Sequence, residues 1–235
     1  MGEEKEEMIS ELQGVVFDMD GVVIDSEITH YTAICEAMGP EVSASFEDFL
    51  NHCTGRDEIF AMTRMAELSC INIKEGDMAR WSIRKGEAYG RLVRQRAVPI
   101  PGSIELVTAV AEELPVGLAT GSRRHDVESA LAVLEGGALQ NVFSAIVTSS
   151  EVDVPKPNPE TYERAVSIME LCPSTCWAIE DSPNGIRSAC DAGLKVVGVT
   201  GTNTRTELSK AGAKFVVNDL QEISLPLLKK WFVES

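Results

Sequence analysis

The stretch VVFDMDGVVIDSE, residues 15–27, decides how the rest of the chain is interpreted. Apolar residues suited to a buried strand lead into Asp18, and a second carboxylate, Asp20, follows two positions later. Gly21 comes next, and glycine lets the backbone turn sharply at such a place. Two acidic side chains at the end of a hydrophobic strand point to a functional site, provided that other strands bring matching groups to the same edge.

Length and composition indicate a globular protein. The chain has 235 residues, which suits one ordinary domain or a core with a smaller insertion, and 44 % of them are hydrophobic. Its apolar runs fall short of the roughly 18 residues that a membrane helix needs, and MGEEKEEM lacks the features of a secretory signal. We therefore expect a cytoplasmic protein with no membrane partner. Its six unevenly spaced cysteines are expected to be reduced and mostly buried.

The charge of the chain restricts its partners. A net charge of −16 repels the phosphodiester backbone, so we expect no nucleic-acid partner. The same charge repels a phosphate monoester. Any phosphate site in this protein must therefore carry its own positive charge, supplied by a metal ion or a lysine.

Two patterns of hydrophobicity divide the chain. Residues 12–18, and the whole chain after about residue 98, alternate short apolar runs with amphipathic stretches. This alternation predicts a parallel sheet with helices on both faces. The further expected strands are 114–121, 144–150, 176–182, 195–201 and 214–217, and the expected helices are 103–113, 123–134, 159–171, 183–192 and 204–211.

Residues 26–97 have a different character. They contain no convincing strand, and apolar residues such as Ile28, Tyr31 and Cys35 recur at helical spacing. PIPG (99–102) is the expected return hinge. We therefore predict an α/β fold in which a doubly wound, Rossmann-like parallel-sheet core carries an inserted α-helical cap. The core would comprise residues 1–25 and 98–235, and the cap residues 26–97.

Polar residues follow four of the predicted strands. Besides the two aspartates, these are the TGS segment (120–122), Lys156 and the pair Glu180–Asp181. Each alone has an ordinary explanation as a helix cap, a solvated lysine or a turn. Ligands of doubly wound sheets, however, bind outside the carboxyl ends of the strands. Four such groups at one edge of the sheet favour a shared function.

These motifs resemble those of the haloacid dehalogenase-like phosphohydrolases. The matching segments are DMDGV (18–22), the Thr in ATGS (119–122), the Lys in PKPNPE (155–160) and EDSPNGI (180–186). The resemblance covers essentially the whole chain, because the helical insertion lies where this family carries its cap. The dehalogenases of the family lack the second aspartate, so Asp20 favours phosphoryl transfer.

The resemblance implies a role for each core residue. Asp18 would attack phosphorus to form an aspartyl phosphate, and Asp20 would act as general acid and then as general base. Thr120 and Lys156 would hold the transferring phosphoryl oxygens. Mg²⁺ would neutralise the charge of the site. Its implied ligands are Asp18, the main-chain carbonyl of Asp20, Glu180 and Asp181.

The substrate side of the site is less well defined. In the beta-phosphoglucomutases of the family, residues at the places of His30 and Lys85 act on the sugar, and one at the place of Arg56 binds a distal phosphate. A surface histidine and two solvated charges are the alternative explanation. The substrate contacts that we expect are His30, Arg56, Lys85, Gly121, Ser122 and Arg123.

The sequence favours a phosphatase over a mutase. Gly86 and Ala88 stand where those mutases carry asparagines, and TGS replaces their Ser-Ala-Ser type of segment. The sugar-phosphate phosphatases of the family resemble TGS more. We therefore predict a monomeric phosphatase whose partner is a small phosphorylated metabolite such as a sugar phosphate. A sugar phosphomutase is the alternative, and a non-catalytic binder of a phosphorylated ligand is a third that no motif favours.

Overall fold

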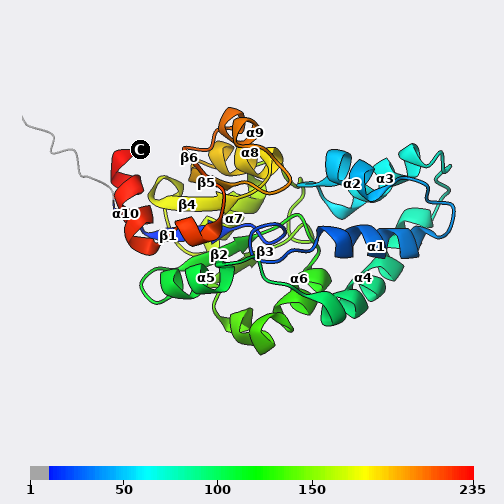
Figure 1. The fold of residues 1–235 in the computed structure, drawn as a ribbon, viewed down its shortest axis with the longest axis horizontal. Coiled ribbons are helices and arrows are strands. Elements are labelled where there is room, and N and C mark those ends of the chain that lie inside the picture. Colours follow the sequence, from blue (N-terminus) through cyan, green and yellow to red (C-terminus); the bar gives the residue numbers. More distant parts are fainter. Residues whose placement is uncertain (1–10) are drawn as a thin grey trace, which may run out of the picture.

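A six-stranded parallel sheet forms the centre of the protein. The computed structural model describes residues 11–235, so residues 1–10 of the predicted core segment lie outside the described residues. The strand order is β3-β2-β1-β4-β5-β6, and every neighbouring pair is parallel (Figure 1). The strands are β1 (Gly14–Phe17), β2 (Val116–Ala119), β3 (Ala145–Val147), β4 (Cys176–Glu180), β5 (Lys195–Val199) and β6 (Phe215–Val217).

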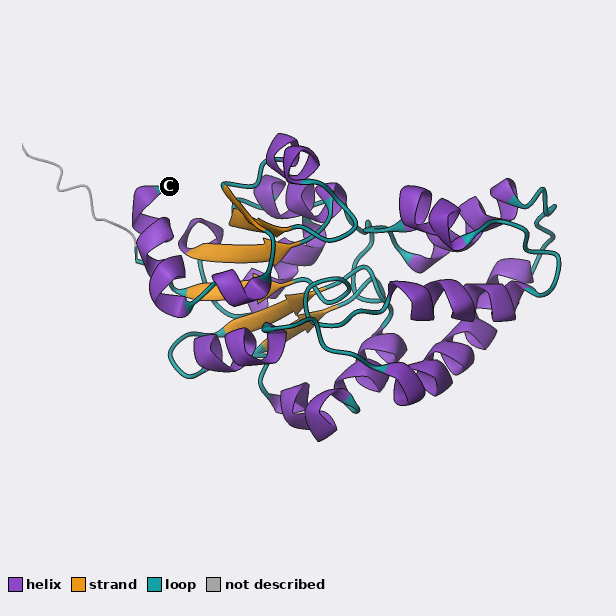
Figure 2. Ribbon diagram, in the orientation of Figure 1, coloured by secondary structure: helices purple, strands orange, loops and turns teal. Residues whose placement is uncertain are grey.

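Helices cover both faces of the sheet and extend beyond one end of it (Figure 2). The extension consists of α1 (Glu27–Met38), α2 (Phe46–Cys53), α3 (Glu58–Leu68) and α4 (Asp77–Arg96). The helices beside the sheet are α5 (Ser103–Ala111), α6 (Arg124–Leu131), α7 (Glu160–Ile168), α8 (Pro183–Asp191), α9 (Arg205–Ala211) and α10 (Leu225–Glu234). Three 3₁₀ segments, η1 (Leu134–Asn141), η2 (Pro173–Thr175) and η3 (Leu220–Glu222), complete the described elements.

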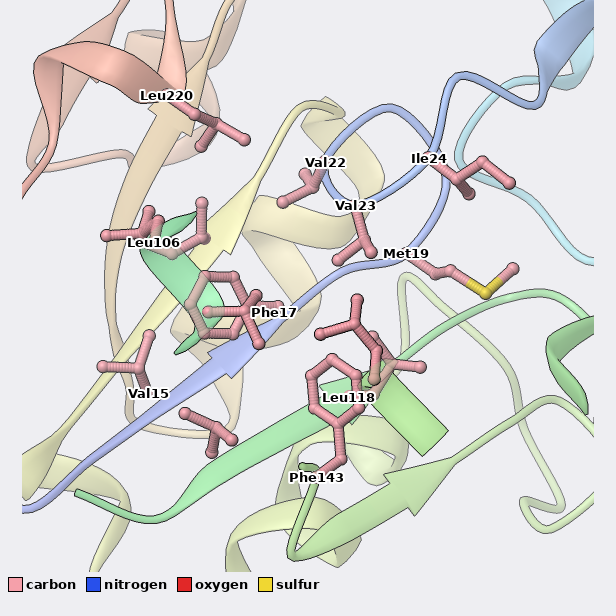
Figure 3. Close-up of a cluster of buried hydrophobic side chains, with 14 of the residues drawn as sticks. Val15, Phe17, Met19, Val22, Val23, Ile24, Leu106, Leu118, Phe143 and Leu220 are labelled. Atoms are coloured by element: carbon pink, nitrogen blue, oxygen red, sulfur yellow. The ribbon is translucent and has the colours of Figure 1, made fainter. Parts of the chain in front are cut away.

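Alternate residues of each central strand enter opposite halves of the core. Val15 and Phe17 of β1 pack with residues of α5, α6 and α10, whereas Val16 packs with residues of α7, α8 and α9. This alternation follows from the two-residue period of a strand. Figure 3 shows the first half, where side chains of β1 and the loop after it meet Leu106 of α5 and Leu118 of β2. The central strands are buried on both faces, which explains their continuous apolar runs.

The four extending helices have a hydrophobic core of their own. Ile34, Phe49, Met62 and Trp81, one from each helix, belong to a separate cluster of buried residues. The helix α2 begins with a capping box, in which Ser45 and Asp48 bond to each other's backbone N–H groups. The helical cap inserted after β1 is thus confirmed. This cluster lies within residues 26–97, although Ala33 of α1 and Ala88 to Val93 of α4 pack with the core around the sheet, and we retain the boundaries 26–97 as a proposal.

The structure departs from the sequence prediction at two points. Helix α10 was not predicted, although Leu225, Leu228 and Phe232 bury an apolar stripe against the sheet. The cysteines were expected to be mostly buried, but of the six only Cys53 and Cys176 are. Within the described residues, none of the helices combines the length and apolar character required to cross a membrane.

Candidate active site

The candidate site lies where strands β1 and β4 end side by side. The two strands pair in parallel from Gly14 opposite Cys176 to Phe17 opposite Ile179. The order of the sheet reverses at this pair, because β2 lies beyond β1 on one side and β5 beyond β4 on the other. Ligands of open α/β sheets bind in the crevice at such a point. The backbone N–H of Asp18 still donates to the carbonyl of Ile179, at 3.0 Å, so Asp18 and Glu180 leave the sheet as neighbours.

Lys156 lies buried between these two carboxylates. Its Nζ is 3.0 Å from Oδ1 of Asp18 and 2.8 Å from Oε1 of Glu180, and it also donates to the carbonyl of Ala119 at 3.0 Å. Burial would lower the pKa of Lys156, but the charges of Asp18 and Glu180 raise it above its ordinary value. The lysine is therefore a fixed cation. It supplies part of the positive charge that a phosphate site in this acidic protein requires.

Glu180 is held firmly by protein donors. Its Oε1 accepts from Lys156 and from the hydroxyl of Tyr162 at 3.1 Å, and its Oε2 accepts from the N–H groups of Asp181 and Ser182 at 3.0 Å each. The space for this carboxylate exists because residue 185 is glycine. A Cβ there would lie 1.6 Å from Oε1 of Glu180.

Three buried carboxylates fit a divalent cation. Asp18, Glu180 and Asp181 each offer an oxygen, and these atoms lie within 4.8 Å of one another. Burial, and then the charge of Glu180, raise the pKa of Asp18 to about 8 and also raise the pKa of Asp181. Without a cation these raised pKa values favour the protonated carboxyls, and a bound cation would favour their ionisation. Hard oxygen donors of this kind are the ligands that Mg²⁺ and Ca²⁺ prefer.

Asp20 sits in a second network of hydrogen bonds. Its Oδ1 lies 2.9 Å from Nε2 of His30 and accepts from the hydroxyl of Ser26, while its Oδ2 accepts from Ser122 at 2.7 Å and Thr120 at 3.2 Å. Burial would raise the pKa of Asp20, but the facing His30 and these hydrogen bonds hold it below the usual carboxyl range. Asp20 is therefore a carboxylate in this arrangement, the form that can accept a proton.

Two of the expected substrate contacts are paired with protein groups. Nε2 of His30 meets Asp20 and lies 3.3 Å from the hydroxyl of Ser122, so the histidine contacts the residue that the sequence predicts as the general acid and base. Lys85 is fully buried, with its Nζ 3.2 Å from Oε2 of Glu58 and hydrogen-bonded to Asp126. The sequence placed both residues on the sugar side of the site. A substrate that bound to His30 or Lys85 would therefore do so beside their protein partners, Asp20 and Ser122 for the histidine and Glu58 and Asp126 for the lysine.

The loop between α2 and α3 rests on the core motifs. A Cβ on Gly55 would lie 2.6 Å from Oγ of Ser182, and one on Gly121 would lie 3.2 Å from the carbonyl of Arg56. Glycines therefore allow the cap and the core to approach closely here. The guanidinium of Arg56 lies over the ring of Phe60, 3.9 Å from its centroid. Its Nε is buried without a hydrogen-bond partner among the described residues.

Residues of the cap and the core together line a partly open cavity of about 60 Å³. Most of the predicted site residues line this cavity. Thr120 lies just behind the lining, where its hydroxyl donates to Asp20. Arg123 instead ties the core to the cap, since it donates to Ser82 and lies 3.5 Å from Glu58. The predicted residues in the lining are Asp18, Asp20, His30, Arg56, Lys85, Gly121, Ser122, Lys156, Glu180 and Asp181.

Sequence reasoning missed several residues of the site. Glu27 lines the cavity, and burial together with the charges of Asp20 and Asp18 raises its pKa to about 8. Tyr162 donates to Glu180 and contacts Lys156. Glu58 carries the partner charge of Lys85. Tyr162 follows Lys156 by six residues and stands one turn into the next helix, a spacing that could have identified it.

The comparison with protein families matches this architecture. A model of the family described as haloacid dehalogenase-like hydrolase matches residues 15–199, which span the sheet from β1 to β5 and the whole cap. The chain belongs to the haloacid dehalogenase-like hydrolase family. The family resemblance that the four motifs indicated is therefore confirmed.

Individual relatives agree with the family assignment. The chain is 32 % identical to Protein CbbY of Rhodobacter capsulatus over 194 residues, covering 80 % of this chain and 85 % of the relative. It is 31 % identical to validoxylamine A 7'-phosphate phosphatase of Streptomyces hygroscopicus subsp. limoneus over 214 residues, 90 % of this chain and 95 % of the relative. The crystal structure of CbbY from Rhodobacter sphaeroides in complex with phosphate shares the fold. It has a TM-score of 0.83 at 23 % identity, with 92 % of this chain and 98 % of that chain covered.

The glycine beside Glu180 generates a direct test. We expect Gly185→Ala to displace the carboxylate of Glu180 and with it Lys156, because the added Cβ has no room. A displacement of about 1 Å in such a site can cost about 10²-fold in turnover. The measurement is phosphatase turnover together with the free energy of unfolding in urea.

A matched control lies in the cap. Gly86 is also helical, and the nearest atom to an added Cβ is 3.6 Å away. Gly86→Ala should leave the positions of Glu180 and Lys156 unchanged and stabilise α4 by about 0.5–1 kcal/mol. Wild-type turnover in Gly185→Ala would show that the position of Glu180 does not matter.

Proposed function

We propose that the protein is a magnesium-dependent phosphatase that hydrolyses the phosphate ester of a small metabolite, most simply a sugar phosphate. The observation that carries this proposal is the pairing of Asp18 with Lys156 at 3.0 Å, beside the acidic cluster and within reach of Asp20. A nucleophile, a fixed cation and an acid–base residue meet in one cavity. The relative named validoxylamine A 7'-phosphate phosphatase supports a small phosphate ester as the substrate class.

The proposed reaction has two steps on one carboxylate. In the first, an oxygen of Asp18 forms a bond to phosphorus while the bond from phosphorus to the leaving oxygen breaks, and Asp20 gives that oxygen a proton. In the second, water attacks the aspartyl phosphate, its proton goes to Asp20, and Asp18 is released with inorganic phosphate. Because Asp20 is a carboxylate before the first step, it must first gain a proton, and His30 lies within hydrogen-bond distance to exchange one.

In this proposal, the acidic residues around the metal site have different roles. Asp18, Asp181 and the main-chain carbonyl of Asp20 would hold Mg²⁺, which when bound neutralises charge on the phosphoryl oxygens. Glu180 was also predicted as a ligand, and its carboxylate is close enough, but both of its oxygens accept hydrogen bonds from protein donors. We therefore revise its proposed role to support of the metal site. Its task is to fix Lys156 and the turn that carries Asp181.

The cavity also bears on how the substrate enters. Pockets that hold small ligands commonly measure about 300–1,000 Å³, whereas this cavity measures about 60 Å³. A sugar phosphate therefore needs the cap to move away from the core before it binds. Arg56, whose buried Nε faces no described partner, is the cap group that we assign to an anionic or polar part of the substrate.

A phosphomutase is the second candidate, because the cap touches the chemistry. A mutase must keep water from its aspartyl phosphate until a sugar hydroxyl arrives, so its cap residues take part in the reaction. The contact between His30 of the cap and Asp20 is consistent with that demand. A phosphatase and a mutase therefore use the same core residues. They differ in the acceptor, water or a sugar hydroxyl, that takes the phosphoryl group from Asp18.

Product analysis distinguishes these functions. We expect the purified protein with Mg²⁺ to release phosphate from several sugar phosphates, measured with a phosphate assay. Beta-glucose 1-phosphate should give free phosphate and glucose. Conversion of beta-glucose 1-phosphate to the 6-phosphate with little phosphate released would replace the phosphatase with the mutase. No turnover of any substrate would leave a non-catalytic binder of a phosphorylated ligand.

The metal requirement is tested by two measurements, the rate of hydrolysis and the thermal midpoint of the protein. Treatment with a chelator should abolish hydrolysis and Mg²⁺ should restore it, whereas Ca²⁺ should inhibit because its looser coordination suits in-line transfer less well. Mg²⁺ should also raise the thermal midpoint of the metal-free protein, since a ligand that binds only the folded state stabilises it by about 2.7 kcal/mol at 100 times its Kd. Sodium chloride of equal ionic strength is the control. Full activity in chelator would refute the magnesium assignment.

The acid–base role of Asp20 is tested by a substitution that cannot exchange a proton. Asp20→Asn keeps the size of the side chain, and we expect turnover to fall by a factor of about 10² to 10⁴. The increase in thermal midpoint with Mg²⁺ should persist, because the expected ligand at this residue is the backbone carbonyl. The fall in kcat/KM should be larger for 4-nitrobenzyl phosphate than for 4-nitrophenyl phosphate, whose leaving group needs no proton. Wild-type rates would rule out the acid–base role.

A further inference from the structure

Tyr89 lies in α4 directly beside the pair formed by Asp20 and His30. It is fully buried, and its ring stacks on the imidazole of His30 with the centroids 4.4 Å apart and the planes at 25°. The stack joins two helices of the cap, α1 and α4. The reaction proposed above gives Tyr89 no role, although it touches the residue that contacts the acid–base carboxylate.

The aromatic ring of Tyr89, and not its hydroxyl, makes the specific contacts at this position. The hydroxyl is buried and has no hydrogen-bond partner among residues 11–235, which destabilises the folded protein relative to phenylalanine. The ring, in contrast, has defined neighbours on two sides. Besides His30, the ammonium of Lys85 lies 4.8 Å from its centroid, and Lys85 is itself fixed by Glu58 and Asp126.

The imidazole of His30 needs such a support. The second side-chain torsion of histidine is broad, so hydrogen bonding and packing decide where each ring nitrogen points. Nε2 meets Asp20 at 2.9 Å and Ser122 at 3.3 Å. If the ring turned away, Asp20 would lose one of the contacts that fix its carboxylate.

We propose that Tyr89 is a positioning residue, whose ring holds the imidazole of His30 in the plane that keeps Asp20 directed at the leaving oxygen. The proposal rests on the proposed function, because it concerns the proton that Asp20 gives in the first step. It predicts a loss that depends on the leaving group. An alkoxide needs this proton to depart, whereas a nitrophenolate does not.

The test compares two substrates of similar size, 4-nitrobenzyl phosphate and 4-nitrophenyl phosphate. We expect Tyr89→Leu to lower kcat/KM for the benzyl ester by about tenfold or more and for the phenyl ester by less than about threefold, because only the first needs Asp20 as an acid. Tyr89→Phe keeps the ring and should restore the wild-type ratio of the two values. An equal fall for both esters in Tyr89→Leu would assign Tyr89 a purely structural role and overturn the proposal.

Two further variants separate positioning from general damage. Trp81→Leu also shortens a buried aromatic residue of α4, but Trp81 belongs to the separate hydrophobic cluster of the cap, so the ratio should stay at its wild-type value. Adding Tyr89→Leu to His30→Ala should have no further effect on the ratio, because the ring would act through a histidine that is gone. A further fall in the double variant would contradict the proposal. If Tyr89→Leu does not fold, Tyr89→Met replaces it.

A spectroscopic measurement tests the stack without any substrate. The ring current of Tyr89 should shift the imidazole protons of His30 in the NMR spectrum, with the resonance assigned by its loss in His30→Ala. Tyr89→Leu should remove this shift and Tyr89→Phe should retain it. Unchanged His30 resonances in Tyr89→Leu would overturn the proposal. Failure of the wild type to release phosphate from these esters and from every sugar phosphate would refute the proposed function, and the NMR result would still decide the stack.

Discussion

The buried contact of Lys156 with Asp18 and Glu180 is the interaction on which the rest of the site depends. Buried charges are costly unless they are paired, and three carboxylates meet here at the ends of two strands. Lys156 and Asp18 are 138 positions apart in the sequence, so their contact forms only after folding has brought these two segments together. Gly185 and Tyr162 then serve this contact, one by leaving room for Glu180 and the other by donating to it. The site and the centre of the fold are therefore stabilised together.

The cap is joined to this core by close contact and by charge. Gly55 lets its loop approach Ser182 to a distance that a side chain would prevent, and Gly121 leaves a contact with Arg56 that a side chain would crowd. Beside them, Lys85 of the cap pairs with Asp126 of the core in a buried position. A buried ion pair adds little net stability, because the desolvation of its charges offsets their attraction. Opening of the cap would return Asp126 to water and leave Lys85 paired with Glu58, so this ion pair selects the arrangement of cap and core without preventing opening.

The core and its motifs could be predicted from the sequence, because each motif is local. Asp18, Lys156 and Glu180 follow strands whose apolar runs are visible, and parallel strands bring their carboxyl ends to one edge. The cap contacts could not be predicted in this way. Pairing of Lys85 with Asp126 depends on how α4 packs on α6, which no local pattern records. Helix α10 was missed because its apolar residues match a stripe on the sheet that exists only after folding.

The environment of Asp20 explains how one carboxylate can serve both steps. Its oxygens bond to the core through Thr120 and Ser122 and to the cap through His30. In the proposed reaction, Asp20 therefore has all of these partners only when the cap lies against the core, which would couple the position of the cap to proton transfer. The cavity beside Asp20 measures about 60 Å³, whereas pockets that hold small ligands commonly measure about 300–1,000 Å³. Entry of a sugar phosphate would therefore require the cap to move, which would separate His30 from Asp20. In the proposed reaction, substrate entry and product release thus alternate with the arrangement in which Asp20 has its full set of partners.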